Sequence, residues 1–521
     1  MDTKALRQKI LDLAIRGKLV PQDPNDEPAS VLLERIREQK MQMVKEGKLK
    51  AKDIKNDTII FVGEDNLHYE KFQDGTVKCI EDEIPFEVPE GWGWARLQSI
   101  TSILTDGTHK TPQYSDAGYI FLSSKNVTSG KIDWDNNMYI PEVLHRELYT
   151  RLAPKAGDIL LAKNGTTGVA AIVDREEVFD IYVSLALIRI VDNSVNPLYV
   201  LRAIESSFIQ DYFNSSLKGI GVPNLHLEHI RKTLMPIPPY TEQDRIILRV
   251  DTFLPLVEQI ATDEAELHYL ISKTKAKVLD LAIRGKLVPQ DPNDEPASVL
   301  LECIRIEKEE LIKQGKIKRD KKESVIFKGD DNSYYEKIGD KISEYAGEDI
   351  PLGWSIASFS QANMFSSETI DPSHFPEEMF ELYSVPNFEL GVPEVIKGQE
   401  IGSSKQSICE NDVLVCKINP RINRVWITGH STSYRILGSS EWIVFRNAYL
   451  HAPYMQFYFS SSYFRELLLS NVSGVGGSLM RAQPESVKKY PVLIPPYKEQ
   501  VRIADKILEL FMKLDDIGAV K

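Results

Sequence analysis

Four stretches of the sequence contain residue types that enzymes use for chemistry. The two IPPY tetrapeptides, at 237–240 and 494–497, are similar to the (Asp/Asn)-Pro-Pro-(Tyr/Phe) motif with which amino-methyltransferases hold the exocyclic amino group of a base. KNGTTGVA, at 163–170, has the glycines of a phosphate-binding loop. Asp158 and Lys163 have a nuclease-like spacing, although a strand that ends in a surface lysine explains them more simply.

None of these stretches completes the chemistry that it suggests. Ile237 and Ile494 stand where the methyltransferase motif needs Asp or Asn, so each Pro-Pro pair is better explained as a helix entry. KNGTTGVA has no Lys-Ser/Thr pair after its second glycine, as a Walker loop requires. No HExxH, GxSxG, deaminase pattern or glycine-rich S-adenosylmethionine loop occurs, and the nine histidines are dispersed. The sequence predicts a chain that is not an enzyme and binds no cofactor itself.

Composition indicates a multidomain globular protein. A chain of 521 residues is too long for one ordinary core, and its 42% hydrophobic and 27% charged residues are typical of globular domains. No apolar run approaches the length of a membrane span, and the N-terminus carries charges that a signal peptide lacks. The four cysteines have no paired spacing, which disfavours disulfides and zinc. A cytoplasmic location is expected, without membrane contact.

The sequence contains a long internal repeat. LDLAIRGKLVPQDPNDEPASVLLE occurs at 11–34 and, letter for letter, at 279–302. In each copy an amphipathic helix is followed by a proline-rich turn and a second helix, with Gly17 as a plausible end of the first helix in copy one. Similarity continues at lower identity from 59–72 to 325–338, and IPPYTEQDRI at 237–246 matches IPPYKEQVRI at 494–503.

A long helix is predicted after the first IPPY motif. Apolar residues from Ile246 to Leu281 alternate in steps of four and three, which is the pattern of a coiled-coil seam. Pro255 is expected to kink this helix or to split it in two. The C-terminus matches the first half of this helix and the N-terminus matches its second half. This circular repeat predicts pseudo-twofold symmetry, with two helical elements side by side and the termini close together.

The segments between the repeats differ in sequence but follow one plan. Each contains several strand patterns, then a helical pattern (197–213 and 453–469), then a glycine-containing loop that leads into IPPY. We therefore predict an α+β fold in which two mixed α/β domains alternate with two long, coiled-coil-like helical elements. The expected boundaries are 1–95 (helical region and linker), 96–236 (first α/β domain), 237–354 (central helical region and linker), 355–493 (second α/β domain) and 494–521 (C-terminal helix).

These motifs together carry a resemblance that covers the whole chain. The chain resembles the specificity subunits of type I restriction-modification enzymes. The resemblance rests on the LAIRGKLVPQDP blocks, the PPY-x-EQ-x-RI helix starts, the GDILLAK and NDVLVCKI strand openings and the DGTHKTPQY stretch (106–114). The LAIRGKLVPQ form suggests the IB subgroup. In that family the two variable segments are target recognition domains, each reading one half of a split DNA sequence. The shared helices set the spacing between the halves and dock two methyltransferase subunits.

The resemblance implies partners as well as a DNA target. The expected partners are double-stranded DNA with a bipartite site, two methyltransferase subunits and, through them, restriction subunits. S-adenosylmethionine is expected in the methyltransferase partner, and ATP and Mg in the restriction partner. Two other classes of function remain open. One is a self-contained DNA methyltransferase or nuclease with attached recognition domains, which the missing motifs disfavour, and the other is an assembly scaffold without DNA contact.

The residues expected to contact DNA lie in polar loops of the two variable segments. Base edges are read by hydrogen-bonding side chains, and phosphates are bound by cationic and small polar ones. The candidates are Thr108, His109, Lys110, Thr111, Lys125, Asn126, Lys163, Asn164, Thr166, Thr167, Asn224, His226, Asn387, Lys417, Asn419, Arg421, Arg424, Ser478 and Arg481. For any one of them, a merely solvated loop position is an equally good interpretation.

The overall charge does not favour a nucleic-acid binder. The chain carries a net charge of −13, whereas DNA-binding domains are usually basic. Residues 96–240 contain 14 Lys and Arg against 15 Asp and Glu, and residues 355–497 contain 11 against 13. DNA binding must therefore depend on local cationic loops, or on partner subunits that neutralise much of the phosphate charge.

Overall fold

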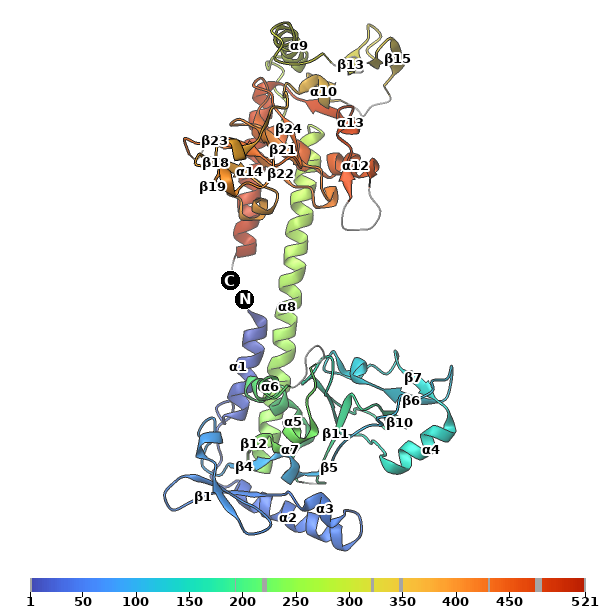
Figure 1. Ribbon diagram of the computed structural model, residues 1–521, viewed down its shortest axis with the longest axis vertical. Helices are drawn as coiled ribbons and strands as arrows, with labels where there is room; N and C mark the ends of the chain where they lie inside the picture. The colour runs from blue at the N-terminus through green and yellow to red at the C-terminus, as the bar shows by residue number, and fades with distance from the viewer. Residues whose placement is uncertain are drawn as a thin grey trace. The chain divides into compact units, whose positions relative to one another are not determined.

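The computed structural model describes residues 2–192, 194–217, 223–319, 323–345, 350–429, 432–473 and 480–519 (Figure 1). The chain forms two compact units, unit 1 from Met1 to Glu264 and unit 2 from Ala265 to Lys521. Helix α8 (Tyr240–Ile283) gives its first part to unit 1 and its last part to unit 2. The described helices include none that is both long and apolar enough to cross a membrane.

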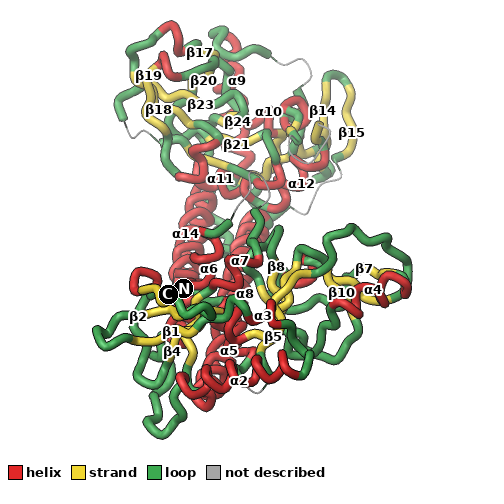
Figure 2. The backbone as a smooth tube through the Cα atoms, turned by 60° about the horizontal axis from the view of Figure 1, so that its bottom comes forward, coloured by secondary structure: helices red, strands yellow, loops and turns green. Residues whose placement is uncertain are grey.

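Unit 1 contains an α/β body, a small outlying sheet and flanking helices (Figure 2). The helices are α1 (Thr3–Ile15), α2 (Ala29–Lys45), α3 (Ala51–Ile54), α4 (Glu142–Arg151), α5 (Pro197–Ile204), α6 (Ser207–Ser215), α7 (Leu227–Lys232) and the start of α8. The strands are β1 (Ile59–Val62), β2 (His68–Lys71), β3 (Val77–Cys79), β4 (Gly93–Arg96), β5 (Thr101–Asp106), β6 (Tyr119–Leu122), β7 (Met138–Ile140), β8 (Ile159–Ala162), β9 (Ala170–Ile172), β10 (Phe179–Ile181), β11 (Leu185–Ile190) and β12 (Leu234–Ile237).

A four-stranded antiparallel sheet, in the order β5-β11-β8-β9, is the centre of unit 1. Its side chains alternate between two cores, as the pleat of a strand requires. Leu161 and Ile188 face the core formed with α1, α5 and α8, whereas Leu160 and Leu187 face the core beneath the β10-β6-β7 sheet. The pairs β4-β12 and β1-β2-β3 form separate small sheets.

Unit 2 repeats this plan with different strands. Its helices are the end of α8, α9 (Ala297–Lys313), α10 (Phe359–Ala362), α11 (Ala452–Ser460), α12 (Ser462–Ser470), α13 (Pro484–Val487) and α14 (Tyr497–Ala519). Its strands are β13 (Ser324–Lys328), β14 (Tyr334–Ile338), β15 (Lys341–Glu344), β16 (Ser355–Ser358), β17 (Thr369–Ile370), β18 (Met379–Tyr383), β19 (Glu394–Lys397), β20 (Lys405–Ser407), β21 (Val413–Cys416), β22 (Val425–Ile427), β23 (Arg435–Gly438), β24 (Trp442–Phe445), β25 (Val472–Ser473), β26 (Arg481–Ala482) and β27 (Pro491–Ile494).

The central sheet of unit 2 has the order β22-β21-β24 and also separates two cores. Val413 and Val415 face the core formed with α11, α12 and α14, whereas Leu414 and Cys416 face the other core, beside Trp442. A five-stranded sheet, in the order β17-β20-β23-β18-β19, stands where unit 1 has β10-β6-β7. The two units therefore share the helical side of the body and differ most on the outer side.

A buried glutamine fixes the start of the long helix in each unit. The Gln243 side chain accepts a hydrogen bond from the Asn196 backbone N–H (2.8 Å) and donates one to the Pro238 carbonyl (3.0 Å). Gln500 does the same with the His451 N–H (2.8 Å) and the Pro495 carbonyl (2.9 Å). Both glutamines are fully buried. These bonds confirm that the Pro-Pro motifs are helix entries, and they join each helix to the α/β body.

Two expectations about helices were wrong in detail. The pattern at 197–213 forms two helices, α5 and α6, because Ser206 has an extended backbone (φ −67°, ψ 153°) and its hydroxyl donates to the Ala203 carbonyl. Ser461 divides α11 from α12 in the same way. Helix α8 is not split at Pro255. Pro255 and Asp251 are both exposed, so water can bind the Asp251 carbonyl that the proline leaves without a donor.

Removing the glutamine carboxamide is expected to destabilise each unit. Gln243→Leu leaves a buried N–H and a buried carbonyl without partners, which costs about 1–3 kcal/mol for each group. We expect the free energy of unfolding, measured by urea titration of the full chain, to fall by about 2–6 kcal/mol. Gln500→Leu should do the same to unit 2. The exposed Gln259 offers a matched control, and the account fails if Gln259→Leu is as damaging as the other two.

Candidate nucleic-acid interface

Three of the predicted loops of unit 1 meet at the end of strand β8. The Lys163 N–H donates to the Ser184 carbonyl (2.8 Å) and its own carbonyl accepts from the Leu225 N–H (2.9 Å), so the segment after β8 lies between two other segments. Asn164 forms a bridge with Asn224. The result is an open cleft of about 670 Å³, lined by Asp106, His109, Lys163, Asn164, Val183, Asn224, His226, Leu227, Glu228 and His229.

Lys163 is a buried member of an ion pair and does not project from the surface. Its Nζ lies 2.5 Å from Asp106 Oδ2, and only 7% of its side chain is exposed. Asp106 also contacts the His109 ring through its other oxygen, at 3.3 Å. The Lys163–Asp106 pair therefore joins two loops at the floor of the cleft.

Asn224 presents an unused hydrogen-bond acceptor beside this pair. Its Oδ1 is buried and has no hydrogen-bond partner among the described residues. Buried polar atoms are nearly always hydrogen-bonded, so such an atom next to an open cleft is typical of a ligand contact. His226 is exposed in the same cleft, and Lys110, Thr111 and Thr166 are exposed in the neighbouring loops. Thr167 is half-buried, and its hydroxyl donates to the Lys163 carbonyl at 3.4 Å.

The fourth loop of unit 1, at 123–126, borders the same cluster. A Cβ on Gly165 would lie 3.7 Å from the Ser124 hydroxyl. Lys125 is exposed and has no ion pair in the described part of the chain. Asn126 is buried instead, since its side chain accepts from the Ser123 N–H (2.9 Å) and donates to the Asn136 carbonyl (2.9 Å). Asn126 therefore holds the turn that presents Lys125.

Thr108 is also mainly structural. It is buried, and its backbone pairs with Tyr182 and bonds to the Ile181 carbonyl at 3.1 Å. Tyr182 was not among the predicted residues, although its hydroxyl lies 3.5 Å from that of Thr111. Asp106, Ser184 and His229 were missed as well. Asp106 ends strand β5, Ser184 lies in the turn before β11, and His229 lies in helix α7.

A buried arginine–aspartate pair lies at the start of the central strand β8 or β21 in each unit. Asp158 is buried, and both of its carboxylate oxygens accept from Arg189, at 2.7 and 2.6 Å. Asp412 binds Arg446 in the same two-bond geometry, at 2.7 and 2.7 Å, and this contact raises the pKa of Arg446. Asp158 and Lys163 therefore belong to separate ion pairs, and the nuclease-like pairing does not form.

Unit 2 builds its loop cluster on the same backbone plan. After strand β21, the Lys417 N–H donates to the Glu441 carbonyl (3.1 Å) and its own carbonyl accepts from the Ala482 N–H (2.9 Å). Ile418 bridges to Arg481, as Asn164 does to Asn224 in unit 1. The Asn419 N–H donates to the Met480 carbonyl (2.8 Å), and Asn419 Oδ1 is another buried acceptor without a partner among the described residues.

Acidic residues hold the cations of unit 2 in place. Glu441 lies 3.8 Å from Lys417 and 3.1 Å from Arg481, and Glu389 lies 3.4 Å from Arg424. Arg421 is exposed in the turn that follows Asn419. Asn387 is half-buried in the turn 386–390, which also carries Glu389. Ser478 lies outside the described residues. Lys417, Asn419 and Arg481 thus lie together at the end of β21, but the DNA contacts themselves stay predictions.

Comparison with known proteins shows similarity to one family. Residues 89–269 match the type I restriction modification DNA specificity domain. The chain is 28% identical to the type I restriction enzyme EcoEI specificity subunit of Escherichia coli, over 99% of this chain and 90% of the relative. It is 32% identical to the EcoAI specificity subunit of the same species, over 61% of this chain and 58% of the relative.

One solved structure supports the fold. A chain from a structure describing complex assembly and conformational transition of the type I R-M system has a TM-score of 0.50 at 14% identity, over 83% of this chain and 93% of that one. Each of the two units has an α/β body with a polar loop cluster at a strand end. The chain is similar to the specificity subunits of type I restriction-modification enzymes.

The two predicted lysines of unit 1 should respond differently to replacement. Lys163→Met leaves the buried Asp106 carboxylate with only the exposed His109 ring as a side-chain partner, and breaking such a buried pair costs about 3–5 kcal/mol. Lys125→Met removes an exposed side chain, so the free energy of unfolding should change by less than about 0.5 kcal/mol. Urea unfolding of the two variants separates these outcomes. Equal stability of the two variants would contradict a structural role for Lys163.

Proposed function

We propose that this chain is the DNA sequence-specificity subunit of a type I restriction-modification complex and that each unit reads one half of a bipartite target. The loop clusters after β8 and β21 are the reading surfaces. The helical elements fix the distance between the half-sites and dock two adenine methyltransferase subunits, through which restriction subunits join. The pseudo-twofold circular arrangement and membership of the IB subgroup are parts of this proposal.

One observation carries the proposal: the two units share a backbone plan at the loop cluster but not its side chains. The bonds of Lys163 to Ser184 and Leu225 are matched by those of Lys417 to Glu441 and Ala482. Around this plan, unit 1 presents histidines, threonines and asparagines, whereas unit 2 presents mainly arginines and asparagines. Equivalent frames with different hydrogen-bonding groups suit the reading of two different half-sites.

Chemistry is assigned to the partners. In the cleft of unit 1, Lys163 and Asp106 are held in an ion pair with each other. The side-chain oxygens of Asn224 and Asn419 can accept hydrogen bonds from the amino groups of bases, which is a binding role and not a catalytic one. S-adenosylmethionine would bind to the methyltransferase, and ATP and Mg to the restriction subunit. A chain with this role works in the cytoplasm. Because neither unit has a surplus of cations, the partners are expected to neutralise much of the DNA phosphate charge.

A domain exchange tests the proposal against both alternatives. Residues 96–236 are replaced by the corresponding segment of a relative with another target, and methylated sites are mapped in cells that also express the methyltransferase. One half of the target should change, while the other half and the gap remain. An unchanged target would instead support a scaffold without DNA contact. Binding of S-adenosylmethionine by the isolated chain would support a self-contained methyltransferase.

Single substitutions should separate base reading from phosphate contact. Asn224→Ala removes the unpartnered acceptor. At one position of one half-site, the complex is then expected to lose about 1–3 kcal/mol of its preference for the correct base over the other bases. Lys125→Ala should weaken binding of the assembled complex to all DNA sequences alike. It should also lower by about 1 the slope of the logarithm of the DNA-binding constant against the logarithm of the salt concentration. The exposed Lys71, on strand β2, is a matched control. Equal effects of Lys125→Ala and Lys71→Ala on the salt slope would contradict a phosphate contact at Lys125.

A further inference from the structure

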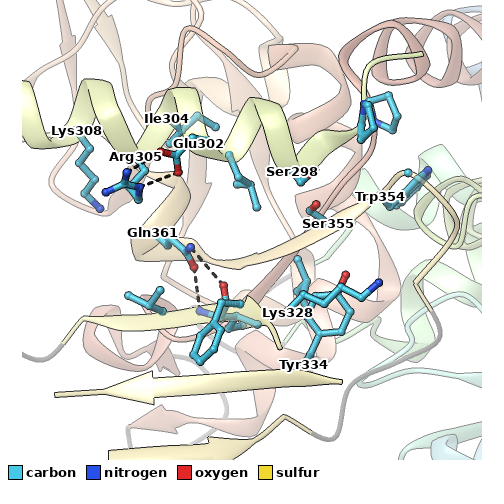
Figure 3. Close-up of a pocket in the computed structure, with 18 of the residues that line it drawn as sticks. Ser298, Glu302, Ile304, Arg305, Lys308, Lys328, Tyr334, Trp354, Ser355 and Gln361 are labelled. Carbon is cyan, nitrogen blue, oxygen red and sulfur yellow. Dashed lines mark hydrogen bonds and ion pairs between the residues drawn. The ribbon is translucent and has the colours of Figure 1, made fainter. Parts of the chain in front are cut away.

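We propose that the hollow between helix α9 and the β13–β14 hairpin of unit 2 binds a linear polyamine. The hollow has a volume of about 960 Å³ and is lined by residues of unit 2 (Figure 3). Figure 3 shows α9 above the two strands, with Ser298 and Trp354 toward one end of the hollow and Lys308 toward the other. No described residue of the loop cluster after β21 lines it, so binding there is independent of the DNA-reading role proposed above.

A buried carboxylate in the hollow lacks the hydrogen-bond donor that its counterpart in unit 1 has. Glu499 lines the hollow with only 1% of its surface exposed, and its Oε1 has no hydrogen-bond partner among the described residues. In unit 1 the corresponding Oε1, that of Glu242, accepts from Gln22 Nε2 at 3.2 Å. Gln290 corresponds to Gln22, but it lies exposed at the wall of the hollow. Buried polar atoms are nearly always hydrogen-bonded, so Glu499 Oε1 indicates a ligand with an N–H donor.

Helix α9 also packs less closely on its unit than α2 does. The first six residues of the two helices, ASVLLE, are identical. Leu32 is nevertheless buried, whereas the corresponding Leu300 is half-buried. The Lys40 side chain is 3% exposed, and the corresponding Lys308 side chain is 14% exposed. Because Lys308 lines the hollow, a ligand there would restore part of the cover that unit 1 provides.

The charges around the hollow favour a cation. Six carboxylates line it against four cationic side chains. Four of these carboxylates form ion pairs among the described residues: Asp294–Arg502, Glu302–Arg305, Glu309–Arg319 and Glu323–Lys308. Asp291 and Glu499 are left without an ion pair in this part of the chain, against Lys328 alone. A buried carboxylate is stabilised most by a charged donor, so an ammonium group suits Glu499 better than a neutral amide does.

The length and the apolar walls of the hollow indicate an extended ligand. Its lining residues on α9 extend from Ser298 to Ile312, which is roughly 21 Å at the rise of an α-helix. Leu301 and Ile304 lie between the charged positions and suit methylene groups. Tyr334 and Trp354 add aromatic rings, which attract ammonium ions. Ammonium groups separated by short methylene chains, as in a linear polyamine, match this alternation.

Isothermal titration calorimetry of the full chain with spermine tests the site. The wild type is expected to bind one spermine molecule saturably. Glu499→Gln keeps the shape of the side chain but removes its charge, and it should weaken binding about 10- to 100-fold because one charge-assisted hydrogen bond is lost. Glu242→Gln is the matched control in unit 1. It removes the same charge from a carboxylate whose two oxygens are already hydrogen-bonded, so spermine binding should be unchanged.

A second pair of variants avoids any buried group. Ser298 is exposed and lines the hollow, so Ser298→Arg places a cation there and should abolish binding. Ser30→Arg makes the same change at the matching exposed position of unit 1 and should not affect it. Circular dichroism verifies that each variant is folded, and the serine pair decides the question if Glu499→Gln is not.

Diffuse attraction of a polycation to this acidic chain predicts a different result. It would not distinguish Glu499 from Glu242, nor Ser298 from Ser30, because each matched pair changes the net charge equally. Equal losses within both pairs, or no saturable binding of spermine by the wild type, would overturn the proposal. Selective loss in Glu499→Gln and Ser298→Arg would support it.

Discussion

The carboxamides of Gln243 and Gln500 are the contacts on which the arrangement of each unit depends. Each one joins the start of a long helix to the N–H at the start of a helix in the α/β body and to a carbonyl of the IPPY segment. A fully buried amide with both ends occupied allows only one geometry, because any shift leaves polar atoms without partners. The helix and the loop cluster of a unit are thereby held as one body.

This constraint explains how a chain can vary its recognition loops without losing its shape. The loops after β8 and β21 are held by backbone bonds at both ends, and the Asp158–Arg189 and Asp412–Arg446 pairs hold the starts of the same strands. Backbone bonds do not depend on side-chain identity. The side chains of these loops are then free to differ between the two units while the backbone frame stays the same.

The sequence predicted the elements better than their contacts. The apolar residues of GDILLAK and NDVLVCKI identified the central strands, and the repeated blocks identified the matching helices. Both predictions depend only on residues that are close together in the sequence. The convergence of 106–111, 163–167 and 223–226 was not predictable, because it depends on backbone bonds between distant segments. For the same reason Lys163 and Asn126 could not be recognised as buried. Ser206 and Ser461 each have an extended backbone that ends one helix, and a helical pattern of apolar residues does not reveal such a residue.

The central claim is that one chain carries two separate DNA-reading sites on a fixed frame. Single-molecule sequencing of DNA from cells that express the wild-type chain with its methyltransferase tests this claim most directly. The account predicts two short defined half-sites, a constant gap of unspecified bases between them, and one methylated adenine on each strand. A single continuous methylated motif would contradict it.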